Sequence, residues 1–72
     1  MSPEKMVHMA NQIAGFFNSQ PNADRAEKVA AHINDFWEPR MRSQLGAYVD
    51  AGGQGLDPLV LQAMEKVRVP AA

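Results

Sequence analysis

Histidines and paired carboxylates are the side chains in this sequence with the most scope for acid–base or metal chemistry. The two histidines, His8 and His32, each stand alone in the chain, whereas a helical zinc site needs ligands at i and i+4 or a cluster with carboxylates. We expect His8 to lie opposite an apolar helix stripe and His32 at the edge of another, both as surface or boundary residues. No cysteine is present, which excludes disulfides, thiolate metal sites and thiol catalysis.

Two carboxylate pairs, Asp24/Glu27 and Asp35/Glu38, have the three-residue spacing that places both groups on one helix face. Catalytic pairs need burial or converging charges that give the two groups different proton affinities. Asp24 and Glu27 have the spacing of a capping box at a helix start instead. Asp35 and Glu38 precede two arginines, with which we expect ordinary charge pairing.

Residues 52–55, with the sequence G-G-Q-G, lack the Lys-Ser/Thr pair and the preceding strand of a phosphate-binding loop. The three serines have no evident base partner, and no segment has the pattern of a nucleophile elbow. The sequence therefore predicts that this chain holds no catalytic, cofactor-binding or metal-binding residues.

Length and charge limit the class of protein. Seven basic against eight acidic residues give a net charge of −1, without the basic excess by which nucleic-acid binders neutralise phosphates. No apolar run approaches the roughly 20 residues that cross a bilayer, and the N-terminus lacks the pattern of a secretory signal. We expect a soluble, cytoplasmic protein with neither nucleic acid nor membrane as a partner. A chain of 72 residues has a marginal core, which a protein partner commonly stabilises.

Four helices can be placed from their start signals, which are a capping side chain, a proline at the first position, or both. Apolar residues at helical spacing follow each start and mark the face that we expect to be buried. The starts are Ser2-Pro3, Asp24, Pro39 and Asp57-Pro58. The apolar stripes are Met6, Met9, Ala10, Ile13, Phe16 and Phe17; Ala26, Val29, Ala30, Ile33, Phe36 and Trp37; Met41, Leu45, Tyr48 and Val49; and Val60, Leu61, Met64 and Val67. Val7, Ala14 and Leu59 fall outside these stripes.

Residues 10–17 and 30–37 share the pattern A-x-x-I-x-x-F followed by a second aromatic residue. Either an internal duplication or the common periodicity of two facing helices explains this pattern. The short connection predicts an antiparallel hairpin, in which the aromatic end of each helix lies over small or flexible residues of the other. The expected pairs are Phe16 and Phe17 over Ala26, and Phe36 and Trp37 over Met6 and Met9.

The expected fold is therefore all-α, a small bundle of about four short helices with this antiparallel hairpin at its N-terminus. We expect a single domain over residues 1–72. The first connection runs through polar residues 18–22, and glycines after Ala51 offer a left-handed C-cap to the third helix. Residues 69–72 should fray.

Residues 36–42, F-W-E-P-R-M-R, combine Trp, Arg and Met, which are enriched at the energetic centres of interfaces. We expect Phe36 to lie in the core. Trp37, Arg40 and Arg42 are candidates for contact with a partner; the alternative is that Trp37 fills the core while the arginines are solvated. Surplus apolar residues outside the stripes favour an interface.

Residues 6–17, M-V-H-M-A-N-Q-I-A-G-F-F, and residues 32–42, H-I-N-D-F-W-E-P-R-M-R, resemble the delta subunit family of NAD-dependent, molybdenum-containing formate dehydrogenases. That family shows an M-A-N-Q-I-A-x-F-F-like opening, a short variable loop, and then F-W-x-P-R-M. A Gly-rich break and a G-L-D-P-L-V-type final helix follow, as in residues 55–60 here. The resemblance covers nearly the whole chain, apart from residues 18–23 and the tail after Val67.

The resemblance implies a non-catalytic accessory subunit, without a cofactor of its own, that supports assembly or stability of a cytoplasmic complex oxidising formate to carbon dioxide and reducing NAD. It implies that the molybdenum pterin, iron–sulfur clusters, FMN and NAD belong to the larger subunits, with the molybdenum-containing catalytic subunit as the expected partner. Amide hydrogen bonds to a partner backbone are a hypothesis for Asn11 and Gln12. The predicted partner-binding residues are Asn11, Gln12, Phe16, Phe17, Trp37, Pro39, Arg40, Met41 and Arg42.

Other classes of protein remain as alternatives. A stand-alone helical adaptor would share these physical features and differ only in its partner. A small enzyme or metal-binding module would need chemistry from the isolated histidines, and a nucleic-acid binder is disfavoured by the net charge.

Overall fold

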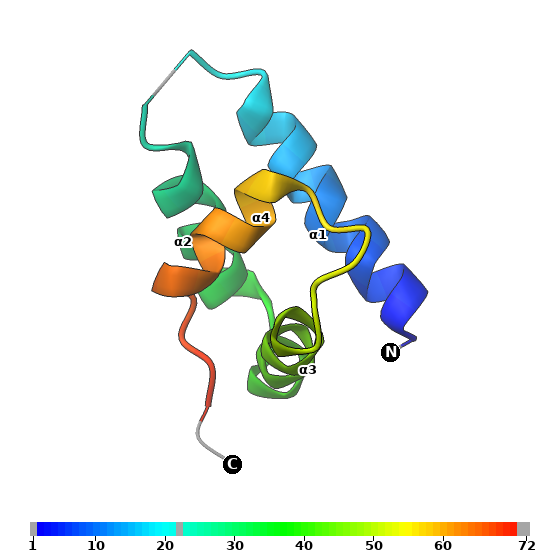
Figure 1. Cartoon of the computed structure of the whole chain (residues 1–72). Coiled ribbons are helices and arrows are strands. Elements are labelled where there is room, and N and C mark those ends of the chain that lie inside the picture. Colours follow the sequence, from blue (N-terminus) through cyan, green and yellow to red (C-terminus); the bar gives the residue numbers. More distant parts are fainter. Residues whose placement is uncertain (1, 22, 71–72) are drawn as a thin grey trace.

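The structure, a computed structural model, describes residues 2–21 and 23–70. Within these ranges it consists of helices without strands (Figure 1), in the order α1 (Pro3–Asn18), α2 (Arg25–Phe36), α3 (Pro39–Asp50), α4 (Pro58–Ala63) and a last 3-10 turn, η1 (Met64–Lys66). The predicted all-α bundle of four short helices is confirmed. The predicted loop residue Asn22 and the tail residues Ala71 and Ala72 lie outside the described residues.

Local capping chemistry starts the helices where the sequence predicted. The backbone N–H of Lys5 donates to the Ser2 hydroxyl at 3.3 Å, and Pro3 is the first residue of α1. At α4 the backbone N–H of Leu59 donates to the Asp57 carboxylate at 2.8 Å. Each cap satisfies one of the N–H groups that a helix start leaves without a partner.

The capping box predicted for α2 is wrong. Asp24 occupies the N-cap, but its side chain makes no cap hydrogen bond, and its φ of −98° and ψ of 33° differ from the extended backbone that aims a capping side chain inward. Its carboxylate lies 3.9 Å from Lys28 Nζ instead. The Glu27 carboxylate accepts a hydrogen bond from Lys66 Nζ at 2.9 Å and so ties α2 to η1.

Glycines end α3 as predicted. The N–H of Gly53 donates to the Tyr48 carbonyl and the N–H of Gly52 to the Val49 carbonyl, both at 3.0 Å. This pair of bonds is the Schellman motif, which needs positive φ at the helix end. Gly52 and Gly53 supply it, with φ of 126° and 61°.

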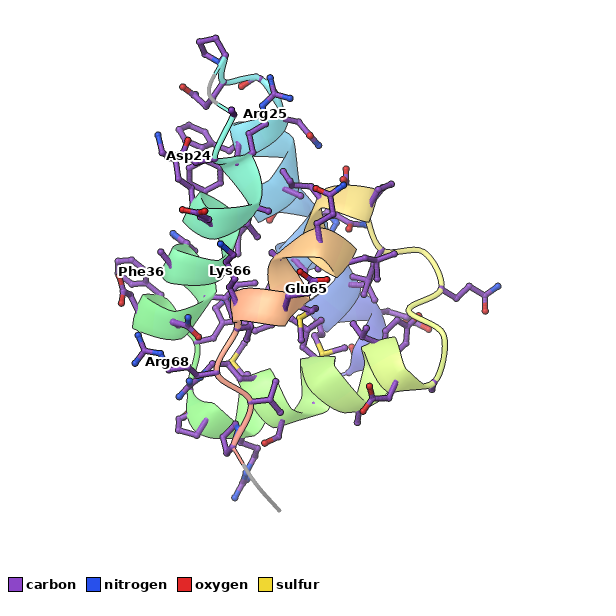
Figure 2. All side chains as sticks on the ribbon, turned by 60° about the vertical axis from the view of Figure 1, so that its left-hand side comes forward. Asp24, Arg25, Phe36, Glu65, Lys66 and Arg68 are labelled. Atoms are coloured by element: carbon purple, nitrogen blue, oxygen red, sulfur yellow. The ribbon has the colours of Figure 1, made fainter. Side chains whose placement is uncertain are left out.

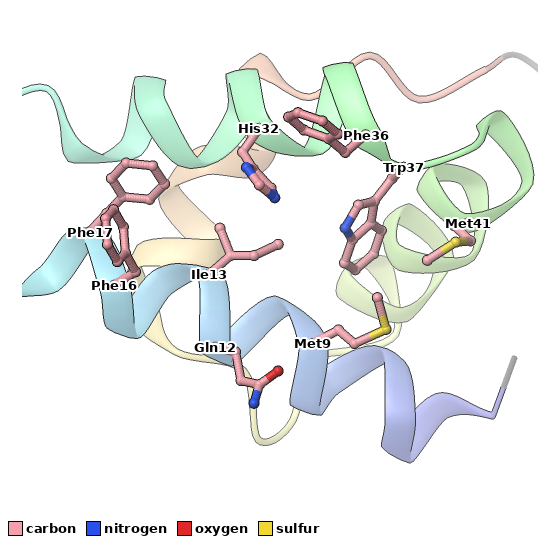
Figure 3. A pocket seen from close by; sticks show the side chains of 9 residues that line it. All are labelled: Met9, Gln12, Ile13, Phe16, Phe17, His32, Phe36, Trp37 and Met41. Carbon is pink, nitrogen blue, oxygen red and sulfur yellow. The ribbon is translucent and has the colours of Figure 1, made fainter.

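α1 and α2 form the expected antiparallel hairpin, α4 packs against both of them, and α3 crosses one end (Figures 1 and 3). The core between these helices consists of Met6, Ala10, Ala14, Val29, Ala30, Ile33, Trp37, Leu45, Leu56, Leu59, Val60, Ala63 and Val67. Ala14 and Leu59 thus belong to the core, contrary to prediction, and Val7 is partly buried against it. Leu61 is 39% exposed because α4 turns Leu59, Val60 and Ala63 toward the interior.

The two aromatic residues at the end of α2 were predicted to share one buried stripe, but only one of them is buried. Trp37 is 6% exposed and lies beside Met9, as expected, whereas Phe36 is 74% exposed and the prediction that it lies in the core is wrong (Figures 2 and 3). Trp37 caps the helix with extended backbone, φ −87° and ψ 135°. Its side chain continues the inward-facing row of Ala30 and Ile33 at helical spacing, whereas Phe36 lies at the edge of that row.

Residues 67–70, here called the C-terminal strap, are held against α2 and α3. Asn34 accepts from the Arg68 N–H at 2.7 Å and donates to the Lys66 carbonyl at 3.1 Å, while Arg42 donates to the Arg68 carbonyl at 2.7 Å. The Val69 side chain packs over Gly46, where a Cβ would lie 3.0 Å from Val69 Cγ1. The predicted fraying is therefore wrong for Val69, and the glycine inside α3 makes room for the strap.

Candidate functional site

An open apolar groove of about 700 Å³ runs between α1 and α2. Figure 3 shows Trp37, Met9 and Met41 at one end, Phe16 and Phe17 at the other, and α4 behind the two helices. No residue of α4 contributes to the lining, so the groove lies on the free face of the hairpin. Its lining is Met9, Gln12, Ile13, Phe16, Phe17, His32, Phe36, Trp37 and Met41.

The groove has no Asp, Glu, Lys or Arg in its lining, and seven of the nine side chains are apolar or aromatic. Ile13 and His32 lie between its two ends (Figure 3). The most exposed walls are Phe16 at 62% and Phe36 at 74%. Apolar side chains gathered on one face make this groove the candidate binding surface of the chain.

Ring contacts hold the two exposed aromatic walls in place. Phe16 meets Phe17 edge to face, with ring centroids 5.1 Å apart and an interplanar angle of 86°. The His32 imidazole lies 4.7 Å from the Phe36 ring at an angle of 35°. Both exposed rings therefore have a neighbour that restricts their rotamers before any partner binds, which lowers the entropy lost on binding.

Five of the residues predicted to bind a partner line this groove: Gln12, Phe16, Phe17, Trp37 and Met41. Pro39 and Arg40 are exposed at the start of α3, next to the Trp37 end. Sequence reasoning missed the other four lining residues. Three of them, Met9, Ile13 and Phe36, were assigned to the buried stripes. His32 was placed at the edge of a stripe, and this boundary position was the one sequence signal for its place in the groove wall.

Asn11 is engaged within the chain. Its Nδ2 donates to the Gly55 carbonyl at 2.9 Å, and its Oδ1 accepts from the Asp57 N–H at 2.8 Å. The hydrogen bonds that were predicted to reach a partner backbone thus reach the chain's own backbone, across the break between α3 and α4. Neighbouring Asn18 donates to the Asp57 carboxylate at 3.1 Å and strengthens the same junction.

Arg42 also turns inward. Its Nη1 bonds the strap at Arg68, and its Nε is buried without a hydrogen-bond partner. The charge pairing expected for Asp35 and Glu38 is absent from the described residues, whose two ion pairs join Lys28 to Asp24 and Lys66 to Glu27. The partner of Arg42 is therefore the Arg68 carbonyl of the strap and not a carboxylate.

The histidines are separated, as their spacing suggested. His8 is exposed on α1, and His32 is half-buried in the groove wall. Within residues 2–21 and 23–70, no three His, Asp or Glu side chains come together where they could share a metal ion. In the part of the chain that the structure describes, each helix is too short or too polar to cross a lipid bilayer.

The fold and the groove together define a small all-helical protein with an open apolar surface. The family model described as NADH-dependant formate dehydrogenase delta subunit FdsD matches residues 5–64, and the chain belongs to this family. The resemblance seen in the sequence is confirmed, and the match extends from the first turn of α1 to the end of α4. A search of curated proteins found no match.

Proposed function

We propose that this chain is a non-catalytic accessory subunit of a cytoplasmic NAD-dependent formate dehydrogenase, and that it supports the assembly or stability of the complex. The larger subunits would oxidise formate to carbon dioxide and pass the electrons to NAD. The family match supports association with these subunits. The molybdenum-containing catalytic subunit is the proposed contact.

The observation that carries this proposal is the uncharged groove between α1 and α2, with Phe16 and Phe36 exposed along it. Covering the remaining exposed surface of these two rings would contribute on the order of 1–2 kcal/mol each. A chain of this size gains a substantial part of its marginal stability from such a contact.

We assign the molybdenum pterin, iron–sulfur clusters, FMN and NAD to the larger subunits. Protein ligands to iron–sulfur clusters are mostly cysteine thiolates, and this sequence has no cysteine. The described residues also bring no cluster of His, Asp and Glu together. What this chain offers the complex is an apolar surface.

Co-expression with the larger subunits tests the proposal. With the affinity tag on the catalytic subunit, the chain should be retained in a fixed ratio, and the complex should lose activity more slowly on warming than one assembled without it. Phe16→Ser combined with Phe36→Ser should reduce retention at least 10-fold. Leu61→Ser, which removes a partly exposed leucine of α4, a helix that does not line the groove, is the matched control.

Two results would contradict the proposal: failure of the unaltered chain to be retained, or equal activity and heat resistance of complexes with and without it. Retention by an unrelated protein in place of the dehydrogenase subunits would favour the stand-alone adaptor.

A further inference from the structure

The two faces of the α1–α2 hairpin are treated differently by the fold. On one face, α4 lies across both helices and buries Leu59, Val60 and Ala63. On the other face, the groove is open over its length (Figure 3). The covered face shows what the hairpin accepts, since α4 is a short helix that presents apolar side chains to two antiparallel helices.

The groove has the length of a short helix. Trp37 and Met9 lie at one end of the groove, and Phe16 lies at the opposite end (Figure 3). Met9 and Phe16 are seven residues apart on one helix, which corresponds to about 10 Å at 1.5 Å per residue. An occupying helix would span this distance with apolar side chains at i, i+3 or i+4, and i+7.

The charges beside the groove give such a helix a direction. Lys5 lies one turn before Met9 on the α1 side, and Asp35 lies three residues after His32 on the α2 side, so each shares a helix face with a lining residue. Both side chains are exposed, and neither belongs to an ion pair of the described residues. Lys28, four residues before His32, shares the α2 face, but its charge is paired with Asp24 at 3.9 Å. Complementarity calls for an acidic edge facing α1 and a basic edge facing α2.

We propose that the groove binds one amphipathic helix of a larger subunit, at least two turns long, with an apolar stripe between an acidic and a basic edge. This inference rests on the proposed function and specifies the partner's chemistry. A second copy of the chain is the alternative occupant, and crosslinking distinguishes the two.

Site-specific photocrosslinking in the intact complex tests this inference. p-Benzoylphenylalanine replaces Phe16 in one variant and Phe36 in another, with Glu65 on η1 as the control position away from the groove (Figure 2). The crosslinks from positions 16 and 36 should fall in a single segment of one larger subunit, about seven residues apart. Position 65 should not reach this segment.

Crosslinks to another copy of the chain, to two separate segments, or to residues about three apart, as a strand would give over 10 Å, would overturn the inference. In these cases the chain would still be retained by the complex, so the proposed function would stand. Absence of the chain from the complex would remove both.

Charge reversal on the groove edges supplies a second readout. Lys5→Glu should weaken binding to the larger subunits roughly 5-fold at low salt and less at high salt. Glu65→Lys reverses an exposed charge away from the groove and should leave affinity unchanged. Equal affinity for the Lys5 variant and the unaltered chain would contradict the proposed edge polarity.

Discussion

Phe36 and Trp37 are neighbours in sequence, but Trp37 packs in the core and Phe36 lies on the surface. Trp37 is nearly buried in the core and presents one edge to the groove, while Phe36 stands in the groove wall with three quarters of its surface exposed. Successive residues of a helix point roughly 100° apart, so Trp37 continues the buried row of Ile33 while Phe36 points to solvent. Stability and binding can therefore be altered independently at adjacent positions.

We expect Trp37→Ala to lower the free energy of unfolding of the isolated chain by about 3–5 kcal/mol, because it leaves a cavity in the core. Phe36→Ala should change it by less than about 0.5 kcal/mol, as at other exposed positions. Urea unfolding followed by circular dichroism measures both. Equal effects of the two substitutions would contradict the assignment of Trp37 to the core and Phe36 to the surface.

Asn11 offers a second residue-scale prediction. Asn11→Ala removes both hydrogen bonds to the backbone of residues 55 and 57 and should destabilise the chain by about 1–3 kcal/mol. Gln12→Ala is the control, because Gln12 is exposed and its side chain only lines the groove. A loss at Gln12 as large as that at Asn11 would show that the amide bonds of Asn11 contribute little.

At the scale of elements, alanine substitutions at two glycines should change the free energy of unfolding in opposite directions. Gly53→Ala places a side chain at φ 61°, with its Cβ 2.8 Å from Leu61 Cδ2, and should cost about 1–3 kcal/mol. Gly15→Ala meets nothing within 4 Å inside α1 and should stabilise by about 0.5–1 kcal/mol. Thermal unfolding of the two variants compares them directly, and unchanged stability of the Gly53 variant would contradict the C-cap argument.

The C-terminal strap provides the other element-scale prediction. Asn34→Ala removes the acceptor for the Arg68 N–H, so exchange of that amide should accelerate about 5-fold or more while core amides change less. Asp35→Ala, at the exposed neighbouring position, should leave the rate unchanged. Hydrogen exchange by NMR resolves the single amide. An unchanged rate in the Asn34 variant would mean that the strap does not depend on this side chain.

The helix starts could be predicted because their signals are local. Ser2-Pro3, Pro39 and Asp57-Pro58 fix caps and first residues within a few positions of the chain. The side of each helix that is buried depends on its neighbours. The periodicity gave each helix an apolar stripe but not the side from which its neighbours approach, so Ala14 of α1 and Leu59 of α4 were missed and Phe36 of α2 was misplaced.

At the scale of the whole molecule, the same limit applies to the candidate site. The resemblance to the delta subunit family indicated residues of the groove wall, including Phe16 and Phe17. It could not show that Asn11 and Arg42 bind this chain and not a partner, because their polar groups bond backbone atoms more than twenty residues away in sequence. These contacts exist only after the four helices have assembled.

Association should stabilise the whole chain and not the groove alone. At a free partner concentration of 100 times Kd, binding adds about 2.7 kcal/mol. Amides of the core that exchange through global unfolding should then slow about 100-fold, including those of α4, which does not line the groove. Mass spectrometry of exchange in the free and assembled chain measures this, and slowing confined to α1 and α2 would indicate only local protection.

The position of α4 also sets the order in which this protein can fold during synthesis. α1 and α2 leave the ribosome before the segment that buries their shared face, since α4 begins at Pro58. Until then the hairpin is apolar on both faces, and a pair of short helices without further packing is unstable in water. The nascent chain is therefore most prone to aggregation just before its last helix emerges.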